Sequence, residues 1–187
     1  PPELAAAISN AGGIGACGAL LMTPKQIISW VSDFKCKSNG SFMLNNWIPG
    51  PEPERNAQHE EAIKSFLAKF GPKVSAEVLD TEPISFSKQC EAMLSARPQV
   101  ISSIMGFYPS AFVKQMKQEG IKWFVTVTSV SEALMAEQAG ADALVVQGLE
   151  AGGHRGNFLS GYDQSAGYGA CMAIVQLPMC RNVNECM

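Results

Sequence analysis

The stretch from residue 100 to residue 146 decides the fold, and it reads VISSIMGFYPSAFVKQMKQEGIKWFVTVTSVSEALMAEQAGADALVV. Short apolar segments alternate in it with segments whose apolar residues recur at helical spacing. Proline or serine stands where each helix would begin, and glycine stands shortly after each would end. Strands are expected over 100–105, 122–127 and 143–146, and helices over 109–118 and 129–139.

The same alternation continues toward the N-terminus. Thr23 is a good N-cap, and Pro24 suits the first position of the helix that follows it. The glycines after residue 10 and the prolines after residue 48 end the neighbouring elements. Further strands are expected over 13–17 and 42–48, and further helices over 2–10, 58–70 and 83–96.

Five short strands that are apolar on both faces, with helices between them, predict a parallel sheet covered by helices. The fold class is therefore α/β. Either a (β/α)8 barrel or a doubly wound open sheet fits this repetition, and the hydrophobic pattern does not choose between them. The alternation stops near residue 160, and residues 161–187 show no convincing helical face and no clean strand.

Composition excludes several functions. The chain has 187 residues, 17% of them charged, and a net charge of −3, so neither nucleic acid nor an anionic membrane is an expected partner. No apolar run is long enough to span a bilayer. Six cysteines without C-x-x-C spacing, and only two histidines, argue against a metal site and favour reduced thiols in an intracellular, cytoplasmic protein.

The segment after the last expected strand, QGLEAGGHRG over residues 147–156, carries the candidate chemistry. Ligands of parallel α/β folds bind at the carboxyl ends of the strands, and glycines let the backbone approach them closely. The imidazole of His154 can take a proton near neutral pH, and Arg155 can hold an anion. The alternative is a glycine-rich surface turn with an incidental histidine. His59, on the polar face of an expected helix, is interpreted as solvated.

A glycine pattern and two neighbouring asparagines allow two interpretations each. Gly12, Gly13 and Gly15 form a G-G-x-G pattern, which is a poor dinucleotide signal and fits close packing of a helix end against the next strand better. Asn45 and Asn46 lie in the second half of an apolar strand. Each amide there is either a self-satisfied core group or a ligand contact.

Taken together, residues 6–15 (AAISNAGGIG), Leu44-Asn45 and residues 147–156 resemble the nitronate monooxygenase family. The resemblance implies a (β/α)8 barrel with non-covalently bound FMN, and oxidation of alkyl nitronates or nitroalkanes by O2 to a carbonyl compound and nitrite. It also implies that His154 is the catalytic base. The remaining positions that it places close to the flavin are Asn45, Gln147, Gly152 and Gly153.

The resemblance covers about residues 3–160 and has departures. The family begins with a strand that precedes the first helix here, and it has later glycine-rich turns for the FMN phosphate that this sequence lacks. We therefore expect a partial barrel of about five βα units over residues 1–160 and a divergent tail over 161–187. Two unpaired sheet edges would allow self-association. The alternatives are an enoyl-thioester reductase of the same superfamily and a truncated, inactive homologue.

Overall fold

The computed structural model describes residues 1–51, 54–72, 83–159 and 173–176. The chain divides into two compact units. The first unit consists of Pro1–Pro49 and Ser85–Met187, and the second is Gly50–Ile84.

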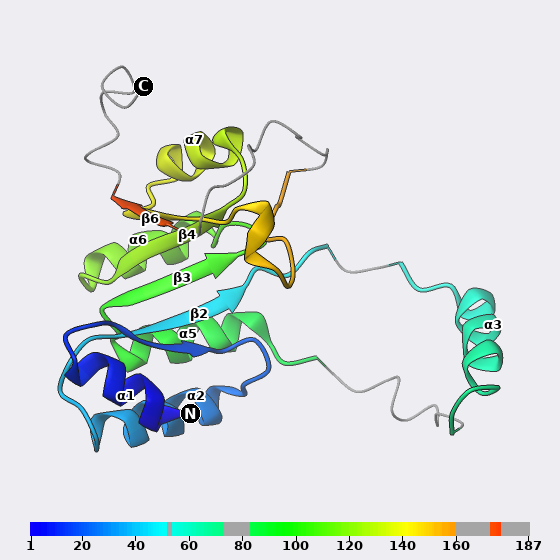
Figure 1. Cartoon of the computed structure of the whole chain (residues 1–187). Coiled ribbons are helices and arrows are strands. Elements are labelled where there is room, and N and C mark those ends of the chain that lie inside the picture. The colour runs from blue at the N-terminus through cyan, green and yellow to red at the C-terminus, as the bar shows by residue number, and fades with distance from the viewer. Residues whose placement is uncertain (52–53, 73–82, 160–172, 177–187) are drawn as a thin grey trace. The chain divides into compact units, whose positions relative to one another are not determined.

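The first unit is built on one sheet (Figure 1). Five strands run parallel in it, and their order in the sheet follows their order in the chain. This order excludes a doubly wound sheet, in which the strand order reverses at a switch point. The five predicted strands are therefore confirmed as part of a barrel-type α/β arrangement. Their bounds are Gly15–Gly18 (β1), Phe42–Trp47 (β2), Val100–Ile104 (β3), Lys122–Val127 (β4) and Ala143–Val146 (β5).

A sixth strand corrects the expectation for the tail. β6, Ala173–Gln176, pairs antiparallel with β5. The absence of a clean strand after residue 160 was thus a wrong prediction. The short run Ala-Ile-Val-Gln is too brief to show a period by itself, and the unpaired backbone groups along β5 supply the partner that makes it a strand. The edge strands of the sheet are β1 and β6, and among the described residues neither has a further strand on its outer side.

Five helices accompany these strands; the first precedes the sheet, and the other four lie between successive parallel strands. Their predicted positions are confirmed to within three residues. Because right-handed crossovers join neighbouring parallel strands, the connecting helices cover one face of the sheet. Side-chain caps begin several of them: Thr23 forms a capping box with Gln26, and Ser129 accepts a hydrogen bond from the Glu132 N–H. The helices are Pro2–Asn10 (α1), Pro24–Lys35 (α2), Phe86–Ala96 (α5), Ser110–Gln118 (α6) and Val130–Gln138 (α7).

The core lies between the sheet and these helices. Phe34 of α2 is fully buried, and its ring lies 5.6 Å from that of Trp30 and 5.0 Å from that of Phe42. Gly15 shows why small residues stand at the start of β1. A Cβ on it would clash with the backbone oxygen of Ala5 and meet the Phe34 ring at 3.0 Å. Close packing of α1 against β1 is therefore the confirmed interpretation of this glycine pattern.

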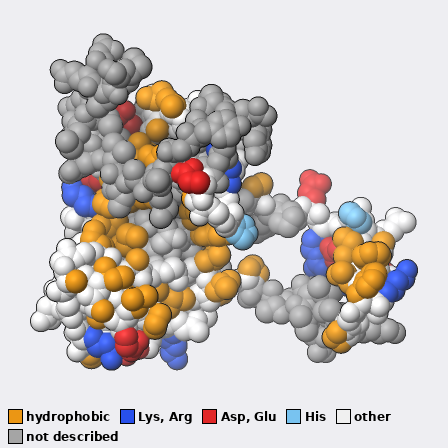
Figure 2. Space-filling view, viewed as in Figure 1, with side chains coloured by type: hydrophobic (Ala, Val, Ile, Leu, Met, Phe, Trp, Pro, Cys, Tyr) orange, Lys and Arg blue, Asp and Glu red, His pale blue; other side chains and the backbone are white. Residues whose placement is uncertain are grey.

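The second unit contains α3, Ala57–Leu67, which is capped by the Asn56 side chain. Its apolar residues are exposed, and Figure 2 shows them gathered on this helix; they are Ile63, Phe66, Leu67 and, just beyond the helix, Phe70. His59 is exposed as predicted. Within the described part of the chain, no helix is long and apolar enough to cross a membrane.

Candidate active site at the carboxyl ends of the strands

The strands carry two sets of side chains, one for each face of the sheet. In β2 the residues Phe42, Leu44 and Asn46 are buried, whereas Met43, Asn45 and Trp47 are only partly covered. Successive side chains of a strand point to opposite faces. The buried set contacts the helices, because Phe42 packs on α2 and Asn46 bonds to α5. Met43, Asn45 and Trp47 therefore line the face without helices.

Asn45 and Asn46, left open by the sequence, have different surroundings. The Asn46 side chain is fully buried and its Nδ2 donates to Gln89 Oε1 at 3.0 Å, so it is a satisfied core amide. Asn45 Nδ2 donates to Ser102 Oγ at 2.9 Å on the helix-free face. Within the described ranges, the side-chain oxygen of Asn45 accepts no hydrogen bond. Asn45 thus keeps an acceptor for a ligand on this face.

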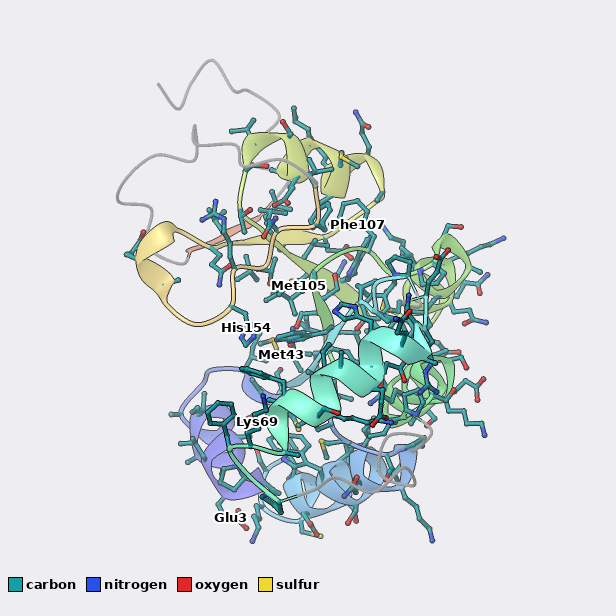
Figure 3. The ribbon with its side chains drawn as sticks, turned by 90° about the vertical axis from the view of Figure 1, so that its right-hand side faces the viewer. Glu3, Met43, Lys69, Met105, Phe107 and His154 are labelled. Atoms are coloured by element: carbon teal, nitrogen blue, oxygen red, sulfur yellow. The ribbon has the colours of Figure 1, made fainter. Side chains whose placement is uncertain are left out.

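His154 lies on the loop after β5 (Figure 3), and its contact with Trp47 places it on the same face of the sheet. Its ring meets the Trp47 ring edge to face, with 5.1 Å between centroids and 67° between planes. The side chain is exposed, and neither ring nitrogen has a hydrogen-bond partner in the part of the chain that is described. Trp47 therefore restricts the ring by packing alone, which leaves both nitrogens for a substrate.

Gln147 holds the loop that carries His154. Its Nε2 donates to the His154 carbonyl oxygen at 3.0 Å, and its Oε1 accepts from the Gly156 N–H at 2.7 Å. Both polar atoms of this amide are thus bound to the backbone of its own loop. The loop begins with the 3-10 turn Leu149–Ala151, in which Glu150 is exposed.

The glycines of this loop have two different roles. Gly152 and Gly153 have φ of 68° and 65°, a conformation that other residues rarely adopt, and nothing lies within 4 Å of where their Cβ atoms would be. Their backbone is bare and open to a ligand. Gly156 instead seats the loop on the sheet, because a Cβ there would approach Ile104 Cγ1 to 2.7 Å.

Several residues at this edge were not predicted from the sequence. Gln89 of α5 is buried and donates through Nε2 to the carbonyls of Ala19, Leu20 and Met22, so it holds the loop after β1. Its position in the sequence carries no signal for this, because the contact spans about 70 residues. Met105, directly after β3, has a φ of 66°, a left-handed backbone that non-glycine residues rarely adopt.

Charge is sparse around His154. Arg155 is partly buried and its Nη2 donates to the Thr128 carbonyl at 3.3 Å, which ties the loop after β5 to the end of β4. No cluster of three or more metal-ligating side chains occurs among the described residues. The arrangement offers an imidazole, the side-chain oxygen of Asn45 and bare glycine backbone, which suits an organic ligand with hydrogen-bonding edges.

A parallel βα sheet whose ligand-facing groups gather at the carboxyl ends of its strands defines a barrel-type α/β enzyme class. A family model described as nitronate monooxygenase matches residues 1–177. The chain belongs to the nitronate monooxygenase family. The match reaches residue 177, beyond the residues 3–160 over which the sequence showed the resemblance.

Individual relatives agree with this assignment. A probable nitronate monooxygenase of Staphylococcus aureus (strain MSSA476) is 31% identical over 179 residues, which cover 94% of this chain and 50% of the relative. The solved nitroalkane oxidase of Streptomyces ansochromogenes has a TM-score of 0.70 at 27% identity, over 86% of this chain and 46% of that one. FabK of Thermotoga maritima has a TM-score of 0.59 at 26% identity, over 83% and 39%. The chain thus spans about half the length of these proteins.

Proposed function

We propose that this chain carries the proton-transfer half of a flavin-dependent oxidoreductase site, one that oxidises alkyl nitronates or nitroalkanes with O2 while FMN is bound. The observation that carries the proposal is the placement of His154. Its imidazole, free at both nitrogens within the described residues, packs against Trp47 at the carboxyl end of the parallel sheet. Membership of the nitronate monooxygenase family supports the reaction class.

The residues present fit the ring end of a flavin. Gly18 at the end of β1, and Gly152 and Gly153 after β5, have open space where a side chain would begin, so a flat ring can lie along their backbone. The Asn45 side-chain oxygen can accept a hydrogen bond from the N–H edge of such a ring. We propose Asn45, Gly152 and Gly153 as ring contacts, with Gln147 acting by shaping the loop beside the ring.

The chemistry of this site divides between protein and cofactor. FMN, when bound, accepts the electrons released by the substrate. His154 takes the α-proton of a neutral nitroalkane, and the electron pair left on carbon delocalises onto the nitro oxygens. Trp47 keeps the imidazole from rotating away, and Gln147 fixes the backbone that carries it. A preformed nitronate has already lost this proton and needs no base.

Flavin uptake is the first test. The purified chain is mixed with FMN, freed of unbound cofactor by ultrafiltration, and measured by its visible flavin absorption. Retention of about one FMN per chain is the expected result. The FMN concentration is set well above the dissociation constants typical of flavoproteins. If the chain is still colourless after ultrafiltration, that result would contradict catalysis by this chain alone and favour the inactive homologue.

Replacement of His154 is the second test. His154→Asn should lower the oxidation of a neutral nitroalkane by about 10²- to 10⁴-fold, the usual contribution of a general base. It should leave oxidation of the preformed nitronate within about tenfold, because that substrate does not use the base. His59→Asn, at an exposed position of α3, is the matched control. An equal loss on both substrates would contradict the proton-transfer role.

The likeness to FabK supports a second candidate, reduction of an enoyl thioester. This reaction consumes NADH or NADPH and needs no O2, so the two activities separate cleanly in one experiment. The FMN-loaded chain is incubated anaerobically with an enoyl thioester and each nicotinamide. Loss of nicotinamide absorbance that depends on the thioester would favour the reductase over the proposed oxidation.

A further inference from the structure

Glu132 of α7 is a buried carboxylate that the mechanism above does not use. Its side chain is 1% exposed. Oε2 accepts hydrogen bonds from the N–H and the hydroxyl of Thr128 at 2.7 and 2.9 Å. Oε1 accepts from the N–H groups of Phe158 and Leu159 at 2.8 and 3.3 Å. The two oxygens therefore join the end of β4 to the far end of the loop that carries His154.

Helix capping alone does not explain this carboxylate. Glu132 stands three residues after the N-cap Ser129, where a glutamate usually reaches back to the N–H of the cap residue. Here it bonds to Thr128, one residue earlier, and to a segment about 26 residues away in the chain. The carboxylate thus serves a tertiary contact in place of the local one.

Backbone and hydroxyl donors balance the charge of this carboxylate. Glu132 forms no ion pair within the described residues. Three N–H groups and one hydroxyl surround it, and it lies in the first turn of α7, where the helix dipole favours a negative charge. A buried anion with this many donors is held in one geometry, and it holds its donors in one geometry in turn.

The His154 loop is consequently fixed at three points. Gln147 binds its middle, Arg155 bonds to the Thr128 carbonyl, and Glu132 binds its end at Phe158 and Leu159. Thr128 takes part in two of these contacts. Its N–H donates to the Glu132 carboxylate, and its carbonyl oxygen accepts from the Arg155 guanidinium. Removing the carboxylate releases the Phe158 and Leu159 N–H groups from α7.

We propose that Glu132 is a positioning residue that fixes the His154 loop on the sheet and so keeps the imidazole against Trp47. The catalytic role of Glu132 rests on the proposed function, whereas its effect on the loop does not. In the absence of flavin, the loop should already be ordered by the carboxylate. In an active holoenzyme, loss of the carboxylate should lower kcat for a neutral nitroalkane while FMN stays bound.

Amide hydrogen exchange of the flavin-free wild-type chain, followed by NMR, tests the contact without any variant. The Phe158 and Leu159 amides should exchange at least about tenfold more slowly than those of Gly152 and Gly153, since only the former are bonded in the described structure. Equal exchange at all four amides would overturn the proposal.

The variant Glu132→Met removes both acceptors and keeps the length of the side chain. It should accelerate exchange at Phe158 and Leu159 by about tenfold or more. It should also shift the indole N–H signal of Trp47, assigned by its loss in Trp47→Phe, and leave that of Trp30 in place. Glu137→Met, at an exposed position on the same helix, is the matched control and should do neither.

The outcomes separate a positioning role from a general structural one. Equal shifts of the Trp30 and Trp47 signals, or no shift of either, would overturn the proposal. Should Glu132→Met not fold, Glu132→Gln is the second variant, and it keeps one acceptor oxygen. It should accelerate exchange either at the Thr128 amide or at the Phe158 and Leu159 amides. Loop ordering without flavin uptake would refute the proposed function alone, and flavin uptake with unchanged exchange in Glu132→Met would refute the positioning role alone.

Discussion

The buried amide of Gln89 offers the sharpest test of how this sheet edge is held together. Gln89→Met keeps an unbranched side chain of similar length and removes both polar ends. In the wild type, its Nε2 bonds to the carbonyls of residues 19, 20 and 22 at 2.8–3.1 Å, and its Oε1 bonds to Asn46 Nδ2 at 3.0 Å. The substitution therefore leaves the Nδ2 of the fully buried Asn46 without its partner, while Asn46 Oδ1 keeps the hydrogen bond from the Trp47 N–H.

The expected loss follows from these contacts. A buried polar group without a partner costs about 1–3 kcal/mol, and a typical hydrogen bond contributes about 1 kcal/mol. The carbonyls of the loop after β1 can regain water, because Leu20 is exposed, so only part of their contribution is lost. The free energy of unfolding should fall by about 2–4 kcal/mol in Gln89→Met.

Urea denaturation followed by circular dichroism measures this loss. Gln115→Met, at an exposed position of α6, is the control and should change the free energy of unfolding by less than about 0.5 kcal/mol. A loss below about 1 kcal/mol in Gln89→Met would refute the reasoning.

Three further predictions concern the packing of Gly15 and the thiol of Cys90. Gly15→Ala should lower the free energy of unfolding by about 1–3 kcal/mol, because the added Cβ meets the Ala5 backbone. Gly18 has open space around it, so Gly18→Ala should stay within about 0.5 kcal/mol of the wild type in the same denaturation assay. Burial raises the pKa of the Cys90 thiol to about 12, so peptide mapping after brief alkylation at pH 8 should find the exposed Cys36 labelled before Cys90. The unfolded thiol ionises at lower pH than the folded one, so the free energy of unfolding should fall as pH rises from about 9 to 12, and less so in Cys90→Ala. Equal labelling of both cysteines, or Gly15→Ala as stable as Gly18→Ala, would contradict these accounts.

The local sequence pattern was enough to predict the helices and strands and the loop that carries His154. The apolar runs and the capping residues predicted the five parallel strands and their helices, because burial and capping act over a few neighbouring residues. The strand order was beyond this pattern, since a barrel and a doubly wound sheet bury the same apolar faces. β6 escaped prediction for a related reason, because its partner β5 lies about 30 residues earlier in the chain.

The amide pair at 45 and 46 shows how a shift of one position separates a candidate site residue from a core residue. Both lie in the same strand, and only the face of the sheet distinguishes them. Asn46 points to the helices and bonds to Gln89, whereas Asn45 points to the helix-free face and bonds to Ser102. The apolar residues around them alternate too weakly to reveal which face is which.

The amino-acid sequence by itself determined that this chain is a parallel α/β protein with His154 in a glycine-rich loop at a strand end. Only the tertiary structure decided what holds that loop. Gln147 is a near neighbour of His154, but Trp47 and Glu132 reach it from β2 and α7, and their contacts join positions far apart in the chain. Periodicity reports which face of an element is buried; it carries no information about which distant hydrogen-bond donor or ring a buried group will meet.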